Sequence, residues 1–288
     1  MIDFLKYKYI SIGVSVLLLV GGLFAYFTRG VNYHVDFSGG SEIRLTFDQS
    51  MDIGHLRTSL SEIGFKDAVI QSHGRTGKSF MIQVKKTEDN LESSFEKLIK
   101  DKFKENPATI DSIDWIGPEV GKDIKFKALL SVLLSLLLIL LYVTFRSKYY
   151  FGIGAVVALA HDMLAVIACF LIFGEQISSH VLAAILTVLG YSINDTIVIF
   201  SRVKENMIKF KNRSMEEIVN LSINQTLRRT TLTSVTTFLA VGSILLLGGE
   251  ALRGFSLAML IGIVVGTYSS IYIASPVMLA FFNPPQES

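Results

Sequence analysis

The sequence predicts a membrane bundle of six transmembrane helices with one external α+β domain inserted after the first helix. Half of its 288 residues are apolar and only 18% are charged, whereas soluble globular proteins have about 25% charged residues. Six apolar segments approach or exceed the ~20 helical residues that cross a hydrocarbon core. A single stretch, residues 30–125, has soluble composition. The composition excludes a disordered chain, and the single Cys169 excludes a disulfide scaffold.

The first apolar segment, residues 9–27, is longer than the ~7–15 apolar residues of a cleaved signal peptide, so we expect an uncleaved anchor. The other spans are expected at residues 128–145, 149–173, 181–200, 232–247 and 255–282. The fifth apolar segment is only 16 residues long. Its helix should therefore begin earlier, near residues 226–228.

The distribution of basic residues predicts the orientation of the bundle. Eleven Lys and Arg residues flank the spans on one side, whereas the short loops 174–180 and 248–254 on the other side hold only Arg253. Basic loops stay in the cytoplasm, so both termini should be cytoplasmic and the domain external, periplasmic in a Gram-negative inner membrane. The predicted divisions are residues 1–29 (N-terminus and first span), 30–125 (domain) and 126–288 (spans two to six, with a cytoplasmic loop at 201–227).

Residues 30–125 hold 13 basic and 16 acidic residues and alternate between strand and helix patterns. Strands are expected at residues 31–37, 42–47, 68–72, 79–85 and 110–116, and helices at 52–63 and 91–103. Gly39-Gly40 is a typical hairpin turn. The order β-β-α-β-β-α-β contains a split βαβ unit, which predicts a ferredoxin-like domain. Its histidines fall in different elements, so no metal site is expected there.

Two acids fall inside apolar spans, where ionisable side chains are costly and usually functional. Asp162 lies near the middle of the third span, and Asp195 lies in the fourth. A carboxyl group in apolar surroundings favours its neutral form and can therefore load and release protons. Asp162 could instead be structural, fixing helix packing as a hydrogen-bonded acid. We assign the adjacent His161, about 100° away around the helix, to packing.

Asp195 has the more specific surroundings. Tyr191 and Ser192 share its helix face at i, i+3 and i+4 spacing, whereas Asn194 is adjacent but turned away. Arg229 falls inside the fifth span at a similar depth, and Thr233 shares its face. Asp195 and Arg229 therefore form a candidate switchable pair. The alternative is that Arg229 only snorkels to the inner headgroups.

Two further patterns concern the fifth and sixth spans. Ser214 and Glu217 form a capping box, and the residues that follow predict a short amphipathic helix along the inner membrane surface or against a partner. Gly262, Gly266 and Ser270 give the sixth span a small-residue seam for close helix packing.

Three strings resemble the SecD/SecF family of export proteins. VDFSGG at 35–40 is similar to the family's motif after the first span. GYSINDT at 190–196, followed by FSRVKEN at 200–206, resembles the fourth-helix signature of its SecF members, and TLRRTT at 226–231 resembles the start of their fifth helix. The resemblance covers essentially the whole chain.

The resemblance implies a non-enzymatic subunit of the RND superfamily. Such a subunit would work with SecD, which supplies the other six-helix half, beside the SecYEG channel, YajC and SecA. The pair would use the proton motive force to complete export of unfolded preproteins. Asp195 would be the proton-responsive carboxylate, Arg229 its partner, and Asp162 a weaker candidate. No nucleotide or metal cofactor is implied. Sodium remains an alternative coupling ion, and an RND-type small-molecule or lipid transporter half and a membrane scaffold remain alternative functions.

Overall fold

A computed structural model describes residues 2–73, 76–84 and 91–282 of the chain. It divides into two compact units. One contains Met1–Asn32 and Leu129–Ser288 and is helical, and the other contains Tyr33–Ala128 and is a sheet with helices. Each unit is described by itself.

Six helices of the described residues are long and apolar enough to cross a membrane, which confirms the predicted number of spans. In chain order they are α1 (Lys8–Arg29), α5 (Pro118–Arg146), α6 (Tyr149–Phe173), α7 (Ser179–Lys209), α8 (Met215–Leu247) and α9 (Glu250–Ser269). A 3-10 turn, η1 (Leu5–Tyr7), precedes α1. The last span continues from α9 through a π-helical turn, η2 (Ser270–Ala274), into α10 (Ser275–Ala280).

The predicted surface helix after Ser214 is wrong as a separate element. The Ser214 and Glu217 side chains do form the capping box, and they start α8. The helix then continues for 33 residues without a break, because the sequence offers no glycine or proline before the apolar stretch. Because α7 continues to Lys209, only residues 210–214 connect the two helices, rather than the expected 201–227.

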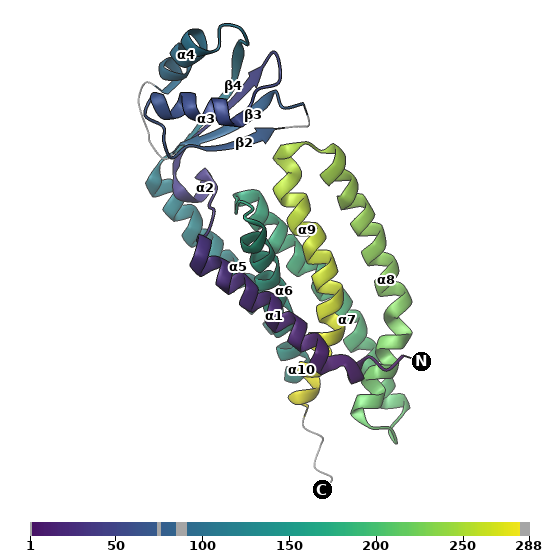
Figure 1. Cartoon of the computed structure of the whole chain (residues 1–288). Coiled ribbons are helices and arrows are strands. Elements are labelled where there is room, and N and C mark those ends of the chain that lie inside the picture. The colour runs from purple at the N-terminus through teal and green to yellow at the C-terminus, as the bar shows by residue number, and fades with distance from the viewer. Residues whose placement is uncertain (1, 74–75, 85–90, 283–288) are drawn as a thin grey trace. The chain divides into compact units, whose positions relative to one another are not determined.

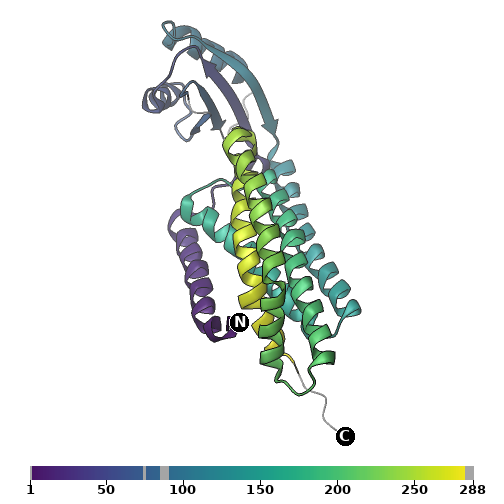
Figure 2. The ribbon, with the colours of Figure 1, turned by 90° about the vertical axis from the view of Figure 1, so that its right-hand side faces the viewer.

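Small residues allow the helices of the bundle to approach closely. In Figure 1, α1 runs beside α6, and Figure 2 shows α7, α8 and α9 side by side. A Cβ atom on Gly266 would lie 2.9 Å from Ser192 Cβ, and one on Gly262 would overlap Val188. The predicted small-residue seam therefore packs against α7, at the level of its polar face.

Hydrogen bonds and ring contacts show which segments meet at each end of the bundle. The backbone N–H of Phe4 donates to Asn220 Oδ1 on α8 at 2.9 Å. Phe282 packs on Tyr150 at the start of α6, with ring centroids 5.3 Å apart. The N-terminal segment, the α5–α6 and α7–α8 connections and the end of α10 therefore share one end. At the other end, Asn32 accepts from the Ile177 N–H at 2.9 Å.

The second unit has a four-stranded antiparallel sheet in the order β2-β3-β1-β4. Its elements are α2 (Val35–Ser38), β1 (Gly40–Phe47), α3 (Ile53–Glu62), β2 (Val69–His73), β3 (Ser79–Val84), α4 (Leu91–Lys102) and β4 (Ala108–Ile116). Alternate residues of β1 and β3 bury one face, with Ile43 opposite Ile82 and Leu45 opposite Phe80. Apolar residues of α3 and α4 complete this core.

One predicted strand of this unit is wrong. Residues 31–37 were expected as a strand, but Val35–Ser38 is the helical turn α2. His34 Nδ1 lies 3.4 Å from the Asp36 nitrogen and 3.0 Å from the Asp36 carboxylate, at the start of this turn. Gly39 and Gly40, at φ +69° and +129°, then redirect the chain into β1 and do not form a hairpin. The expected end of β3, residue 85, lies outside the described residues.

Candidate ion-coupling site

Helix α7 places three polar side chains in the interior of the bundle. Ser192, Asp195 and Thr196 are all buried, with at most 3% of each residue exposed. Helical spacing puts Ser192 and Asp195 on one face, as the sequence predicts. Tyr191 is half-buried beside them, and Asn194 is exposed on the surface of this chain.

Asp162 on α6 meets this face through Ser192. The Ser192 hydroxyl donates to Asp162 Oδ2 at 2.5 Å, and both residues have no exposed surface. The other carboxyl oxygen, Oδ1, lies 3.2 Å from Nδ1 of the adjacent His161. Asp162 therefore has a partner at each oxygen, which is how a buried carboxyl group is stabilised.

The hydrogen bonds continue beyond His161 into α1 and α9. His161 Nε2 lies 2.9 Å from the Ser15 hydroxyl, which lies 3.0 Å from the Tyr268 hydroxyl. Tyr268 in turn donates to the backbone oxygen of Ser11. We call this set, from Ser192 through Asp162, His161 and Ser15 to Tyr268, the buried polar chain. It links α7, α6, α1 and α9 through side chains that donate or accept hydrogen bonds.

From the sequence alone, His161 is assigned to packing, and Ser15 and Tyr268 are not predicted as site residues. The helical angle between His161 and Asp162 is large, but both side chains are long enough for their tips to meet. The signals available were a His-Asp pair within an apolar span and two serines, Ser11 and Ser15, at i, i+4 in the first span.

Asp195, unlike Asp162, has a carboxyl oxygen without a hydrogen-bond partner among the described residues. This oxygen, Oδ2, is buried. The Arg229 charge and the Ser234 hydroxyl, both on α8, act on this carboxyl group. No ion pair within 4.0 Å joins Asp195 to Arg229 in the described part of the chain, and Arg229 is exposed. The structure thus places the predicted pair on facing helices without direct contact.

The buried face of α8 is a row of hydroxyl groups that the sequence reading missed. Ser222, Thr226, Thr230 and Ser234 recur at every fourth residue, and all are at most 8% exposed. We call them the hydroxyl row. It begins near the α7–α8 connection, where Asn206 donates to Ser222 at 2.8 Å. Its last member, Ser234, shares a hydrogen bond of 2.7 Å with the Thr267 hydroxyl on α9.

Further buried polar atoms without partners among the described residues lie on α7 and α8. The Tyr191 hydroxyl and Thr230 Oγ1 are buried and, within the described residues, have no hydrogen-bond partner. Thr233, in contrast, donates to the Arg229 and Thr230 carbonyls of its own helix, at 3.1 and 2.9 Å. Buried polar atoms without partners are rare and need an explanation. Asp195 Oδ2 is a third such atom within the described residues.

The α+β unit holds a second charged cluster, at the glycine pair. The His34 ring lies 3.0 Å from Asp36 and 2.7 Å from Glu42, whose other oxygen binds Arg44 at 3.0 Å. Burial alone would lower the pKa of His34, but the hydrogen bonds and charges of Asp36 and Glu42 outweigh it and raise that pKa to about 9. Burial alone would raise the pKa of Glu42, but the bonds from His34 and Arg44 lower it.

This cluster fixes the segment that leads into the sheet. A Cβ atom on Gly39 would lie 2.8 Å from Pro118 Cα, and one on Gly121 would lie 3.0 Å from the Gly39 nitrogen. The glycine pair therefore packs, backbone against backbone, on the beginning of α5. Across the described ranges no group of three His, Cys, Asp or Glu side chains is placed to hold a metal ion.

Two family models match the chain. Residues 95–283 match the C-terminal model of the protein export membrane proteins SecD and SecF. Residues 24–51 match the SecD/SecF GG motif, which includes the glycine pair.

Similar proteins cover nearly the whole chain. Protein translocase subunit SecF of Thermodesulfovibrio yellowstonii is 41% identical over 96% of this chain and 94% of its own length. Protein translocase subunit SecF of Pseudomonas aeruginosa is 39% identical over 96% of this chain and 90% of its own length. A crystal structure of SecDF, a translocon-associated membrane protein from Thermus thermophilus, is 37% identical with a TM-score of 0.88. The match covers 97% of this chain and 38% of that longer one.

Proposed function

Because the chain belongs to the SecD/SecF family and is a SecF-type subunit of the Sec protein translocation system, we propose that it couples an ion gradient to preprotein export. With SecD, it would use the proton motive force to help complete export through the SecYEG channel. The observation that carries the proposal is Asp195, a buried acid with an unpartnered oxygen beside Arg229.

The coupling would work through protonation of Asp195. An unpaired charge in the membrane interior is unstable, so the carboxyl group is neutral while Arg229 stays away. When the proton leaves, the carboxylate attracts Arg229, and α8 shifts toward α7. A proton crossing the membrane supplies ~2.3 kcal/mol per 100 mV, enough to bias two helix arrangements that differ by a few kcal/mol.

The hydroxyl row would be the path between Asp195 and the α7–α8 connection, because Ser and Thr hydroxyls both donate and accept. The buried polar chain around Asp162 would be a second part of the site, since its hydrogen bonds join Ser192 on α7 to His161 on α6 and Ser15 on α1. The exposed Asn194 and the locally bonded Thr233 would support the site from its edge.

We further propose a bacterial inner-membrane location with both termini cytoplasmic and the α+β unit, a ferredoxin-like domain, in the periplasm. In support, the N-terminal segment, the end of α10 and the basic connections all lie at one end of the bundle, and basic connections remain cytoplasmic.

SecD would supply the second six-helix half, because this chain covers 38% of the SecDF chain that it resembles. The Sec channel with SecA, YajC and unfolded preproteins would be the further partners. The coupling ion would be the proton, with sodium as the alternative, and no cofactor would be required.

The test is preprotein export into membrane vesicles after ATP is exhausted, under an imposed ΔpH or ΔpNa. We expect Asp195→Asn to abolish the gradient-driven part of export while assembly with SecD persists. Glu205→Gln is the matched control, because Glu205 is an exposed acid on the same helix, paired with Arg202. Full gradient-driven export by Asp195→Asn would refute the coupling role, and a response to ΔpNa alone would identify sodium.

A further inference from the structure

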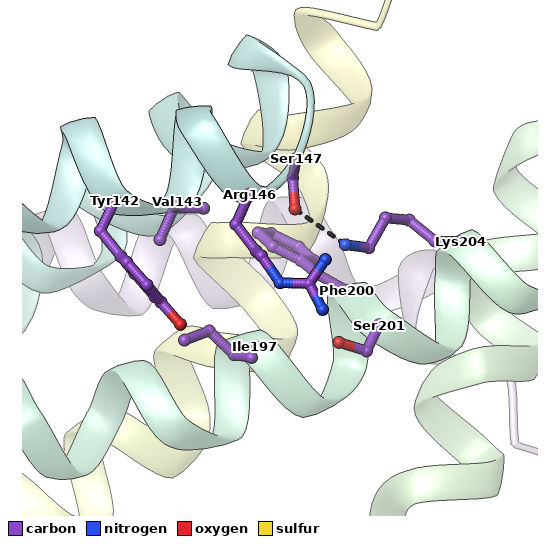
Figure 3. A pocket seen from close by; sticks show the side chains of 8 residues that line it. All are labelled: Tyr142, Val143, Arg146, Ser147, Ile197, Phe200, Ser201 and Lys204. Atoms are coloured by element: carbon purple, nitrogen blue, oxygen red, sulfur yellow. Dashed lines mark hydrogen bonds between the residues drawn. The ribbon is translucent and has the colours of Figure 1, made fainter.

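A pocket of about 190 Å³ lies where the end of α5 meets α7. Figure 3 shows it from close by, with the Arg146 side chain extending from α5 toward Phe200 and Ser201 on α7. The polar and aromatic residues that line it are Tyr142, Arg146, Ser147, Phe200, Ser201 and Lys204.

The pocket is positively charged and has no matching acid. Lys204 Nζ donates to the Ser147 hydroxyl at 2.8 Å, and the Arg146 guanidinium has no ion pair or hydrogen bond among the described residues. No Asp or Glu of the described residues lines the pocket. The next acid along α7, Glu205, points to Arg202 at 2.7 Å. Two cations and two serine hydroxyls thus line one space.

The position of the pocket along α5 fits the headgroup level of a bilayer. The uncharged apolar stretch of α5 ends at Phe145, and Arg146 follows it directly. Tyr142 is 61% exposed, and Tyr149, just after the connection, is 49% exposed. Tyrosines at this depth are typical of the membrane interface. Below them the exposed side of α5 is apolar, with Leu138 and Leu141 both 55% exposed.

We propose that this pocket binds the phosphate of an anionic phospholipid in the leaflet at the basic end of the bundle. Arg146 and Lys204 would bind the phosphate oxygens, and the two serines would donate to it. The acyl chains would lie along the exposed apolar side of α5. A pocket of about 190 Å³ holds a headgroup phosphate, whereas drug-sized ligands need about 300–1,000 Å³. The absence of a lining acid disfavours headgroups that carry an ammonium group.

The experiment uses the full chain in nanodiscs of phosphatidylcholine with a small fraction of phosphatidylglycerol of the same acyl chains. Native mass spectrometry after gentle release counts the retained lipids. We expect the wild type to retain phosphatidylglycerol selectively. Arg146→Gln and Lys204→Gln should each weaken this retention about fivefold, the effect of losing one basic residue near an anionic surface, and the double variant should abolish selectivity.

Lys209→Gln is the matched control, because Lys209 is an exposed cation on α7 outside the pocket. Ser201→Asp is a second variant that keeps both cations and places a carboxylate in the pocket, and it should also expel the lipid. Equal retention by wild type and double variant, or equal retention of phosphatidylcholine, would overturn the proposal. So would displacement by millimolar inorganic phosphate, which would identify a soluble anion, or a carboxylate of SecD cross-linking to Lys204 in place of lipid.

Discussion

Replacing Ser192 with alanine removes the only hydroxyl that reaches Asp162 Oδ2 among the described residues. The bond is 2.5 Å long and joins two residues without exposed surface. A hydrogen bond to a charged group contributes about 1.5–3 kcal/mol and a neutral one about 1 kcal/mol. Interhelical hydrogen bonds in membranes reach only about 1.7 kcal/mol. We therefore expect Ser192→Ala to lower the free energy of unfolding by about 1.5 kcal/mol.

The assay is reversible unfolding of the full chain in mixed micelles with a rising fraction of SDS, followed by circular dichroism. Ser269→Ala is the matched control, because Ser269 is equally buried but, within the described residues, its hydroxyl bonds only to Gly266 of its own helix, at 3.2 Å. A double-mutant cycle with Asp162→Leu isolates the pairwise free energy.

Either of two results would contradict this expected loss of stability. Ser192→Ala could be no more destabilising than Ser269→Ala. Alternatively, the coupling with Asp162→Leu could fall below about 0.3 kcal/mol, the error of additivity for independent sites. Both results would mean that the polar contact between α6 and α7 does not hold the helices together.

Three further predictions follow from other parts of the chain. Thr230→Val, which keeps shape but removes an unpartnered hydroxyl, should slow gradient-driven export with little change in stability; unchanged export would exclude the hydroxyl row as a path. Gly266→Leu should destabilise the bundle by about 1–3 kcal/mol through overpacking against Ser192, and a wild-type SDS midpoint would contradict the close packing of α9 on α7. The folded-state pKa of His34 is about 9, above its ordinary value of 6.5, so its stabilising effect should be complete below pH 6.5 and lost as pH rises through 9. Hydrogen exchange of β1, corrected for the intrinsic pH effect, should therefore accelerate above pH 7 in the wild type, and this extra acceleration should be absent in His34→Gln.

Periodicity predicts the elements of this chain wherever one face is apolar. All six spans, and the helices and later strands of the α+β unit, lie where hydropathy and alternation put them. The strand expected over residues 31–37 failed because its conformation depends on a local bond from His34 and on two glycines at positive φ. Alternation cannot distinguish such a turn from a strand.

In the candidate site, too, some features follow from the sequence and others do not. The face of Tyr191, Ser192 and Asp195 follows from the geometry of one helix, and the structure has it. Contacts between helices depend on rotation and depth, which no single helix specifies. For that reason the bond between Ser192 on α7 and Asp162 on α6 does not follow from the sequence. The distance between Asp195 and Arg229 does not follow from it either.

The length of α8 has a practical consequence. Because one uninterrupted helix carries Arg229 and also begins at the capping box of Ser214, a turn or slide of the helix at the arginine would also move its first residues. A fluorophore or spin label at the exposed Glu216, thirteen residues from the arginine, would therefore report such a movement from the surface of this chain.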